Sequence, residues 1–521
     1  GYSESIHLKD GTFFEAKIDA VKSGYHIFEI PKSQIIQIKY KSNKNDKDYI
    51  SFVTNTHIST DIIKYINGNY YIKIKNGEIG TVGDITKIDE NAALSTKVAV
   101  KTKDKKSDFF LRLHGSNTIG AKLAPALIEA YLKKLGASDI VSVSKGSEES
   151  EIHALLNNKN IKVGLAAYGS STSFKDLDAG LCDIGMASRR VKDKEVVALQ
   201  RYGNMKSITN EHVIAIDGIA VFINQKNPIF KLNTTQLKDI FTGKINSWKH
   251  LDGDDGLINL YARDKQSGTW DTFNKLILNK EPLKSDAKRY EDNTKLSNDV
   301  SNDVNGIGFG GLPYILNSKE LAISDGETTI RPDKYTVATE DYPLSRRLYL
   351  YTQKDMSNNV KSFIDFVLSA DGQKIVENIG FVDLNIKEFK PLLSDDMPKE
   401  YKKLVTGLYR LSTNFRFNSK NDKLDNKAKK DLERLAKYFR ENSSNKKSIY
   451  LVGFSDSRGA VKTNLRLSKK RAQSAMIYLS SRGIKIDENN IKGFGEAYPV
   501  ASNKSKKGRS KNRRVEIWVK K

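Results

Sequence analysis

Apolar and polar positions alternate in the first part of the chain, up to about Ile88. Runs such as "YHIFEI" and "YYIKI" have the period of two that is typical of half-buried strands. The dipeptides Asp10-Gly11 and Asn76-Gly77 favour hairpin turns. Residues 22–30 resemble residues 66–74, which indicates a duplicated β unit. We therefore expect a small β-rich module over residues 1–100, with an interaction or spacer role because it lacks the residue types of a catalytic site.

The pattern changes after the charged run at residues 101–108, which has the composition of a linker. From about Phe109 to about Pro398, apolar strands alternate with amphipathic helices. "FFLRLHG" predicts a strand, and residues 123–136 predict a helix because apolar residues recur every three to four positions before a glycine. This alternation is typical of an α/β domain, which we place at residues 107–398.

A third domain is predicted at residues 410–521. Helical periodicity at 426–442 and 467–483 alternates with strand patterns at 447–456 and 513–519, which gives a compact βαβαβ unit. Ser468 is the expected N-cap of the second helix, and Gly483 is its expected stop. The predicted fold class of the whole chain is therefore α/β with a small N-terminal β module.

Composition limits the function classes. The 521 residues include one cysteine, Cys182, and seven histidines without metal-ligand spacing, so no metal, cofactor or disulfide framework is expected. No apolar run reaches the roughly 18 residues of a transmembrane helix. The chain begins at Gly1 rather than Met, so a secretion signal removed from its start is one interpretation.

Charge is concentrated at the end of the chain. The net charge is +24, and residues 413–521 alone contain 29 basic and 10 acidic residues. This excess favours a polyanionic partner, either nucleic acid or an anionic envelope polymer, and a lysine-rich solvated surface is the alternative. The basic cluster at residues 504–514 has no interleaved aromatic residues, and no nucleic-acid-binding motif occurs, so we expect no nucleic-acid partner.

Three loops of the middle domain have the composition of an oxyanion site. "HGSNTIG" (114–120), "YGSST" (168–172) and "ARDKQSGTWDTF" (262–273) are small hydroxylic turns next to helix starts, where backbone N–H groups meet anions. Arg263 precedes Ser267-Gly268-Thr269 by four residues, and a guanidinium forks onto two oxygens of a tetrahedral anion. Each loop alone is more often an ordinary turn, so their combination carries the prediction. Since no nucleophile–base pair accompanies them, we expect a binding protein and not an enzyme.

These segments, together with "DIGMASRRVKDKE", "GIGFGGLPY" and "YPLSRRLYLYT", resemble the phosphate-type periplasmic substrate-binding proteins of ABC importers over residues 109–389. The resemblance implies a two-lobed fold that clamps phosphate in the cleft between its lobes, with an ABC importer as a partner. The implied ligands are Thr118, Ser170, Arg263, Ser267, Gly268 and Thr269. Ser188 and Arg189 stand where the best-known members place an aspartate that repels sulfate, so they belong to the expected site and leave the exclusion of sulfate open.

The end of the chain resembles the OmpA-like peptidoglycan-binding domain, through its "LSKKRA" and "GRSKNRRVEI" motifs. The resemblance implies that an aspartate and an arginine hold the diaminopimelate of the peptidoglycan stem peptide, whose ammonium and carboxylate form a zwitterion. The matching residues are Asn418, Asp456, Asn464, Arg471 and Arg513.

Together the resemblances imply a protein of the periplasm, associated with the cell wall or outer membrane of a Gram-negative-type envelope. Two functions stay open at this point. One is a wall-anchored receptor that captures phosphate or a similar oxyanion, and the other is a structural or sensory envelope protein without a transport role.

Overall fold

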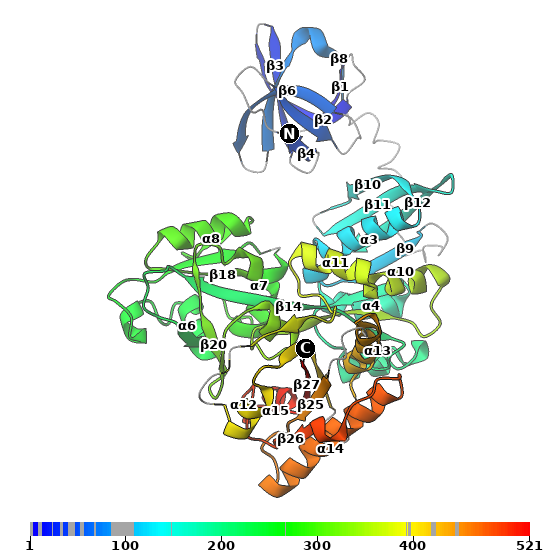
Figure 1. Ribbon diagram of the computed structural model, residues 1–521. Helices are drawn as coiled ribbons and strands as arrows, with labels where there is room; N and C mark the ends of the chain where they lie inside the picture. Colours follow the sequence, from blue (N-terminus) through cyan, green and yellow to red (C-terminus); the bar gives the residue numbers. More distant parts are fainter. Residues whose placement is uncertain are drawn as a thin grey trace. The chain divides into compact units, whose positions relative to one another are not determined.

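A computed structural model describes residues 4–8, 13–22, 24–31, 35–39, 47–52, 57–66, 69–84, 109–146, 148–265, 267–391, 393, 397–417, 424–442 and 448–520 (Figure 1). The chain divides into two compact units. The first unit consists of residues 1–110 and 135–164, and the second consists of residues 111–134 and 165–521. Within the described residues, none of the helices has the length and apolar character needed to cross a membrane.

An eight-stranded sheet forms most of the first unit, in the order β4-β5-β6-β7-β3-β2-β1-β8. Its strands are β1 (Glu4–Leu8), β2 (Phe13–Lys22), β3 (Tyr25–Pro31), β4 (Ile35–Lys39), β5 (Asp48–Phe52), β6 (His57–Ile66), β7 (Asn69–Lys75) and β8 (Ile79–Asp84). The alternation in the sequence buries one face of each hairpin, where Phe14 stacks on Phe52 with ring centroids 4.6 Å apart. The two similar segments supply β3 and β7, which are antiparallel neighbours.

The turns of this sheet differ in part from the prediction. Asp10 and Gly11 lie outside the described residues. Asn76-Gly77 does not close a hairpin, so that prediction was wrong: residues Asn76–Glu78 form the short 3-10 helix η2, and the strand that follows pairs with β1 instead of β7. The first unit also contains the antiparallel pair β10 (Ser138–Ser144) and β11 (Glu149–Leu156) and most of β12 (Lys159–Ala166).

One long strand organises the two-lobed region of the second unit. β14 (Glu211–Ile223) is buried along all of its length. Its first half pairs with β22 (Ser345–Thr352), which pairs with β13 (Ile184–Ala187), and β13 runs parallel to β9 (Leu111–Gly115). Its second half pairs with β18 (Gly306–Gly311), and that sheet continues through β16 (Asn259–Arg263) and β17 (Lys288–Tyr290). The strand therefore links lobe one, built on β9, β13 and β22, to lobe two, built on β16, β17 and β18.

Helices cover both lobes (Figure 1). Lobe one has α3 (Leu123–Lys134), α10 (Asn358–Leu368) and α11 (Ala370–Ile379), where Tyr131 and Phe363 meet edge to face. Lobe two has α6 (Thr234–Thr242) and α8 (Asn293–Asn302). The remaining elements of the region are α2 (Asn117–Gly120), α4 (Ser170–Ala179), α5 (Asp193–Ala198), η4 (Gln200–Tyr202), β15 (Lys231–Asn233), η5 (Trp248–Leu251), α7 (Gly268–Phe273), η6 (Asn274–Leu278), η7 (Leu312–Tyr314), β19 (Lys319–Glu320), β20 (Ala322–Ser324), β21 (Thr329–Ile330) and α9 (Lys334–Ala338).

The terminal domain is a five-stranded sheet in the order β23-β24-β27-β25-β26. Its elements are β23 (Glu388–Phe389), α12 (Lys399–Val405), β24 (Tyr409–Arg416), α13 (Asn426–Glu441), β25 (Ser448–Gly453), α14 (Val461–Ser480), η8 (Glu488–Asn490), β26 (Ile491–Gly493), α15 (Lys506–Asn512) and β27 (Arg514–Lys520). Leu432, Leu435, Ala472, Ala475 and Leu479 on the two long helices pack in the core over the sheet. The predicted alternation of strands and helices is present.

The second long helix begins earlier than predicted. α14 starts at Val461, so Ser468 is an interior residue and its assignment as the N-cap was wrong. Its hydroxyl donates to the Leu465 carbonyl at 2.8 Å and accepts from the Gly495 N–H at 2.9 Å. α14 can lie this close to the sheet because residue 453 is a glycine. A Cβ on Gly453 would stand 2.0 Å from the Ser468 carbonyl oxygen.

Buried polar groups join the terminal domain to the two-lobed region. Asp341, which is 5% exposed, accepts hydrogen bonds from Arg416 at 3.2 Å and from Asn414 at 3.3 Å. Arg347 on β22 pairs with Glu340 on one side and with Asp425, the N-cap of α13, at 2.9 Å on the other. These pairs hold the terminal domain against β22, and the start of this strand lines the cavity described next.

Candidate functional site

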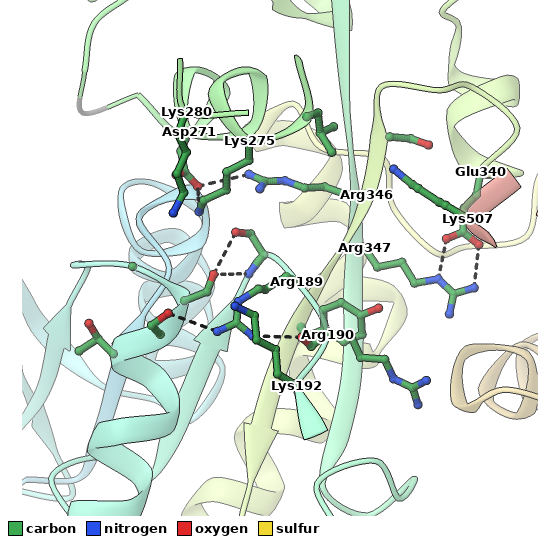
Figure 2. Close-up of a pocket in the computed structure, with 18 of the residues that line it drawn as sticks. Arg189, Arg190, Lys192, Asp271, Lys275, Lys280, Glu340, Arg346, Arg347 and Lys507 are labelled. Atoms are coloured by element: carbon green, nitrogen blue, oxygen red, sulfur yellow. Dashed lines mark hydrogen bonds and ion pairs between the residues drawn. The ribbon is translucent and has the colours of Figure 1, made fainter. Parts of the chain in front are cut away.

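A cavity of about 790 Å³ lies in the second unit (Figure 2). Five parts of the two-lobed region supply its walls: the start of α4, the segment after β13, Glu340 after α9, the start of β22, and the region of α7 and η6. The terminal domain adds two side chains from α15. Its lining residues are Tyr168, Gly169, Ser170, Ser171, Thr172, Ser188, Arg189, Arg190, Lys192, Asp271, Lys275, Leu276, Lys280, Glu340, Ser345, Arg346, Arg347, Tyr349, Lys507 and Lys511.

A hydroxyl corner forms where two predicted site residues meet. The hydroxyl oxygens of Ser170 and Ser188 are 3.0 Å apart, and the Ser188 N–H donates to Ser170 Oγ at 2.9 Å. The Gly169 N–H donates to the Gly115 carbonyl at 2.6 Å, which ties the second predicted loop to the first. Gly115 has a φ of 139°, and a Cβ there would stand 2.1 Å from the Met186 carbonyl oxygen, so glycine is needed at this crossing.

Arg189 lies beside this corner. It pairs with Glu195 at 2.7 Å, donates to Ser171 Oγ at 3.3 Å and stacks over the Phe174 ring at 5.1 Å. Burial raises the pKa of the Glu195 carboxyl, but hydrogen bonding from Arg189 outweighs it and the net pKa is lowered. Glu195 therefore stays ionised and holds the guanidinium in place at the position where the sequence lacks the expected aspartate.

Arg346 contacts polar side chains from several elements around the cavity, and the sequence analysis assigned it no role. Its Nη2 donates to Thr118 Oγ1 at 2.8 Å and also to Thr272 Oγ1. Its Nε lies 3.5 Å from Asp217, and its Nη2 lies 3.6 Å from Asp271. The signal was present in the sequence, because "YPLSRRLYLYT" is one of the motifs on which the resemblance rests, and its first arginine is Arg346.

The start of α7 meets the start of α2. A Cβ on Gly268 would stand 2.7 Å from Thr118 Cα, and Thr118 Oγ1 donates to Asp271 at 3.2 Å. Ser267 is the N-cap of α7 and accepts from the Trp270 N–H at 3.4 Å, while Thr269 lies in the first turn of that helix. The structure thus brings Thr118 and Gly268 together, although neither is among the residues that line the cavity.

Arg263 is not among the residues that line the cavity. Its guanidinium turns toward the segment after β17, where it donates to the Tyr290 carbonyl at 3.2 Å, to the Glu291 carbonyl at 2.9 Å and to Asn293 Oδ1. Burial lowers the pKa of Arg263, and these acceptors, which compensate for the burial, belong to lobe two itself. The structure therefore engages the Arg263 guanidinium within lobe two, and Arg263 does not line the cavity with Arg189 and Arg346.

Electrostatically, the cavity is strongly basic. Nine lysine and arginine side chains line it, against two acids, Asp271 and Glu340. Both acids are engaged: Asp271 pairs with Lys275 at 2.7 Å, and Glu340 receives a hydrogen bond from Arg347 at 2.9 Å. Such a surface concentrates anions, and its hydroxyl corner offers hydrogen bonds to phosphoryl oxygens.

The second predicted site lies in the terminal domain. Asp456, in the loop after β25, pairs with Arg513 at 2.7 Å and accepts from the Arg458 N–H at 3.0 Å. Arg471 on α14 is 3% exposed, and its guanidinium lies 5.7 Å from the centre of the Phe417 ring. Asn464 donates to Glu496. Asn418 lies outside the described residues. The structure thus joins Asp456 to Arg513 and places Arg471 against an aromatic ring.

Comparison with known proteins finds matches for the two-lobed region and for the terminal domain. Residues 149–371 match the PBP superfamily domain, and residues 415–513 match the OmpA family. Phosphate-binding protein PstS of Staphylococcus aureus (strain USA300) is 31% identical over 302 residues, which cover 54% of this chain and 90% of the relative. Protein SphX of Synechococcus elongatus is 33% identical over 270 residues, which cover 49% and 77%. The crystal structure of PstS from Borrelia burgdorferi is 25% identical with a TM-score of 0.40, covering 52% of this chain and 98% of that one. The family matches confirm the two resemblances seen in the sequence.

Proposed function

Because this chain belongs to the family of phosphate-binding proteins that includes PstS, we propose that its two-lobed region captures phosphate or a similar oxyanion. The observation that carries the proposal is the basic cavity with its hydroxyl corner, where Ser170, Ser188 and Arg189 meet. Each charge-assisted hydrogen bond contributes roughly 1.5–3 kcal/mol. A handful of such bonds gives micromolar affinity, on the order of −8 kcal/mol, after the cost of association.

The anion would act by joining the lobes. Lobe one supplies Thr118 and Ser170, and lobe two supplies Gly268, which already touches Thr118. A ligand with better contacts in the closed arrangement shifts the population toward that arrangement. The predicted ligands Arg263, Ser267 and Thr269 remain part of this proposal as residues of lobe two, with Arg346 added as the cation nearest to Thr118.

Sulfate should compete in this site. Selective exclusion of a fully ionised oxyanion needs a carboxylate that accepts the proton of phosphate, and Ser188 and Arg189 occupy that position here. Asp271, the acid nearest to Thr118, is already paired with Lys275. We therefore expect phosphate and sulfate affinities within about tenfold of one another, which corresponds to roughly 1.4 kcal/mol.

Calorimetry of the full chain against phosphate tests the proposal. Arg189→Gln should weaken binding by about tenfold or more, since it removes one charge-assisted contact of roughly 1.5–3 kcal/mol. Arg440→Gln, an exposed arginine of α13, removes the same charge elsewhere and should leave the affinity unchanged. Equal phosphate affinities of the parent and Arg189→Gln would contradict the proposal that phosphate binds at the hydroxyl corner.

We also propose that the OmpA-family domain binds the peptidoglycan stem peptide. A diaminopimelate ammonium would take the place of Arg513 at the Asp456 carboxylate, and its carboxylate would meet Arg471 and Arg513. The double variant Asp456→Asn/Arg471→Gln should no longer sediment with purified cell wall. Glu488→Gln, an exposed acid of the same domain, is the control, and sedimentation of the double variant equal to the parent's would contradict the clamp.

We further propose that the protein works in the periplasm, at the cell wall or outer membrane, where it would pass its anion to an ABC importer. The buried junction through Asp341 and Arg347 favours a second candidate, a sensory or structural envelope protein, because it fixes the two-lobed region to the anchor. Phosphate uptake by cells separates the two. Loss of uptake on deletion of the protein supports the transport role, and unchanged uptake with altered envelope behaviour supports the second.

A further inference from the structure

The cavity is large for one small anion. Its volume of about 790 Å³ lies in the range of about 300–1,000 Å³ that is usual for drug-sized ligands. A single water occupies on the order of 30 Å³ of liquid, and a tetrahedral oxyanion is only a few times larger. Orthophosphate at the hydroxyl corner would therefore leave most of the cavity to other ligand atoms or to water.

Its charge also exceeds what one phosphate neutralises. Beyond Arg189 and Arg346, the ammonium groups of Lys280, Lys507 and Lys511 line the cavity. Of these three, Lys511 donates its described hydrogen bond to a backbone carbonyl, that of Tyr342, and not to a carboxylate. An anion with several negative charges along its length would match this lining better than one that has a single charged centre.

Two of these lysines come from the terminal domain. Lys507 and Lys511 are four residues apart on α15, so they share one face of the helix. Lys511 Nζ donates to the Tyr342 carbonyl at 3.1 Å, which fixes the helix to the two-lobed region. Figure 2 shows the Lys507 side chain entering the cavity beside Glu340, with Arg346 and Lys275 also directed into it.

The positive charges around Lys507 and Lys511 repel one another. Burial, then Lys507 and Arg416, lower the pKa of Lys511 to about 7, and burial together with Arg346 lowers the pKa of Lys507. Burial, despite Asp271, also lowers the pKa of Lys275. A polyvalent anion would relieve this repulsion, because it lies between the charges that repel.

We propose that the cavity binds a condensed phosphate, a chain of two or more phosphoryl groups. One phosphoryl group would sit at the hydroxyl corner with Arg189, and the next would contact Lys507 and Lys511 of the terminal domain. This inference rests on the proposed anion-binding function and extends it, because it assigns the OmpA-family domain a part in ligand binding. In this proposal the OmpA-family domain supplies part of the anion-binding site in the cavity.

Calorimetry of the full chain with orthophosphate, pyrophosphate and tripolyphosphate at 0.15 M salt tests the proposal. The parent should bind tripolyphosphate at least about thirtyfold more tightly than orthophosphate, as one or two added charge-assisted contacts predict. Lys507→Gln/Lys511→Gln should lower the tripolyphosphate affinity by about tenfold or more and change the orthophosphate affinity by less than about threefold. Lys462→Gln/Lys469→Gln removes two exposed lysines of α14 and should change neither.

The outcomes separate the two claims. Equal parent affinities for tripolyphosphate and orthophosphate would overturn this inference and leave the proposed function standing. Absence of binding to all three anions would overturn both. Equal loss of tripolyphosphate affinity in the α15 and α14 double variants would show a general charge effect and would also overturn the inference. Should the α15 double variant fold poorly by circular dichroism, Lys507→Gln alone, which keeps the Lys511–Tyr342 bond, should still reduce tripolyphosphate affinity measurably.

Discussion

The junction at Asp341 gives the sharpest stability prediction. This carboxylate is 5% exposed and accepts hydrogen bonds from Arg416 at 3.2 Å, Asn414 at 3.3 Å and Thr339 Oγ1 at 3.0 Å. Asp341→Ala would leave the Arg416 guanidinium buried with carbonyl acceptors in place of its carboxylate. Breaking a buried pair by removing one partner costs about 3–5 kcal/mol.

The lower end of that range is expected. Arg410, whose Nη2 lies 4.0 Å from Asp341, keeps Glu516 at 3.2 Å when the aspartate is removed. We therefore expect a loss of about 3 kcal/mol in the free energy that holds the terminal domain to the two-lobed region. Because that free energy couples the terminal domain to the two-lobed region, the two should unfold in separate transitions in the Asp341→Ala variant.

Differential scanning calorimetry measures this effect. The parent should show a joint transition for the two-lobed region and the terminal domain, and Asp341→Ala should show two transitions, with at least one at lower temperature. Asp255→Ala, at an exposed position of lobe two, should change stability by less than about 0.5 kcal/mol. A calorimetric trace of Asp341→Ala that superimposes on the parent's would refute the reasoning.

Three further predictions follow from single sites. Cys182 is 1% exposed and burial raises the pKa of its thiol, so a thiol reagent should modify it in denaturant and leave the native protein unreacted; rapid native labelling would contradict its burial. The pKa of Lys511 is about 7, so its charge is present below pH 7 and lost above it, and the tripolyphosphate affinity of the parent relative to Lys511→Gln should fall between pH 6 and pH 8.5; a ratio independent of pH would contradict this titration. The charged groups that act on this ammonium are Lys507, Arg416, Asp341 and Glu340. Gly453→Ala should lower the thermal stability by about 1–3 kcal/mol because its Cβ would clash with the Ser468 carbonyl, whereas Gly146→Ala, with open space around it, should be nearly neutral by the same melting measurement.

Periodicity in the sequence was sufficient to predict the strands and helices that carry the core, because apolar spacing reflects which face is buried. It failed where long-range pairing decides the local structure. Asn76-Gly77 has the composition of a hairpin turn, yet β8 pairs with β1, a strand more than 70 positions earlier in the sequence. Ser468 has the composition of an N-cap, yet its hydroxyl serves a contact with Gly495 that no local pattern encodes.

The candidate site was predictable in part for the same reason. Turn composition marked Thr118, Ser170 and Gly268 because helix starts and close approaches need small residues, and the structure places these in contact or near contact with other parts of the site. Arg263 was expected at the anion because of its spacing, but its direction depends on the carbonyls of residues 290 and 291. Lys507 and Lys511 lie more than 230 positions after Arg263, so only tertiary structure shows that they line the cavity.

The seven-residue helix α15 connects the two proposed binding sites. Lys507 and Lys511 line the cavity, and Arg513, which follows the last residue of the helix, is the partner of Asp456 at the proposed peptidoglycan site. By thermodynamic reciprocity, if the bound anion changes the affinity for peptidoglycan by some factor, peptidoglycan changes the affinity for the anion by the same factor. If α15 couples the two proposed sites, attachment to peptidoglycan would change the affinity of the cavity for its anion.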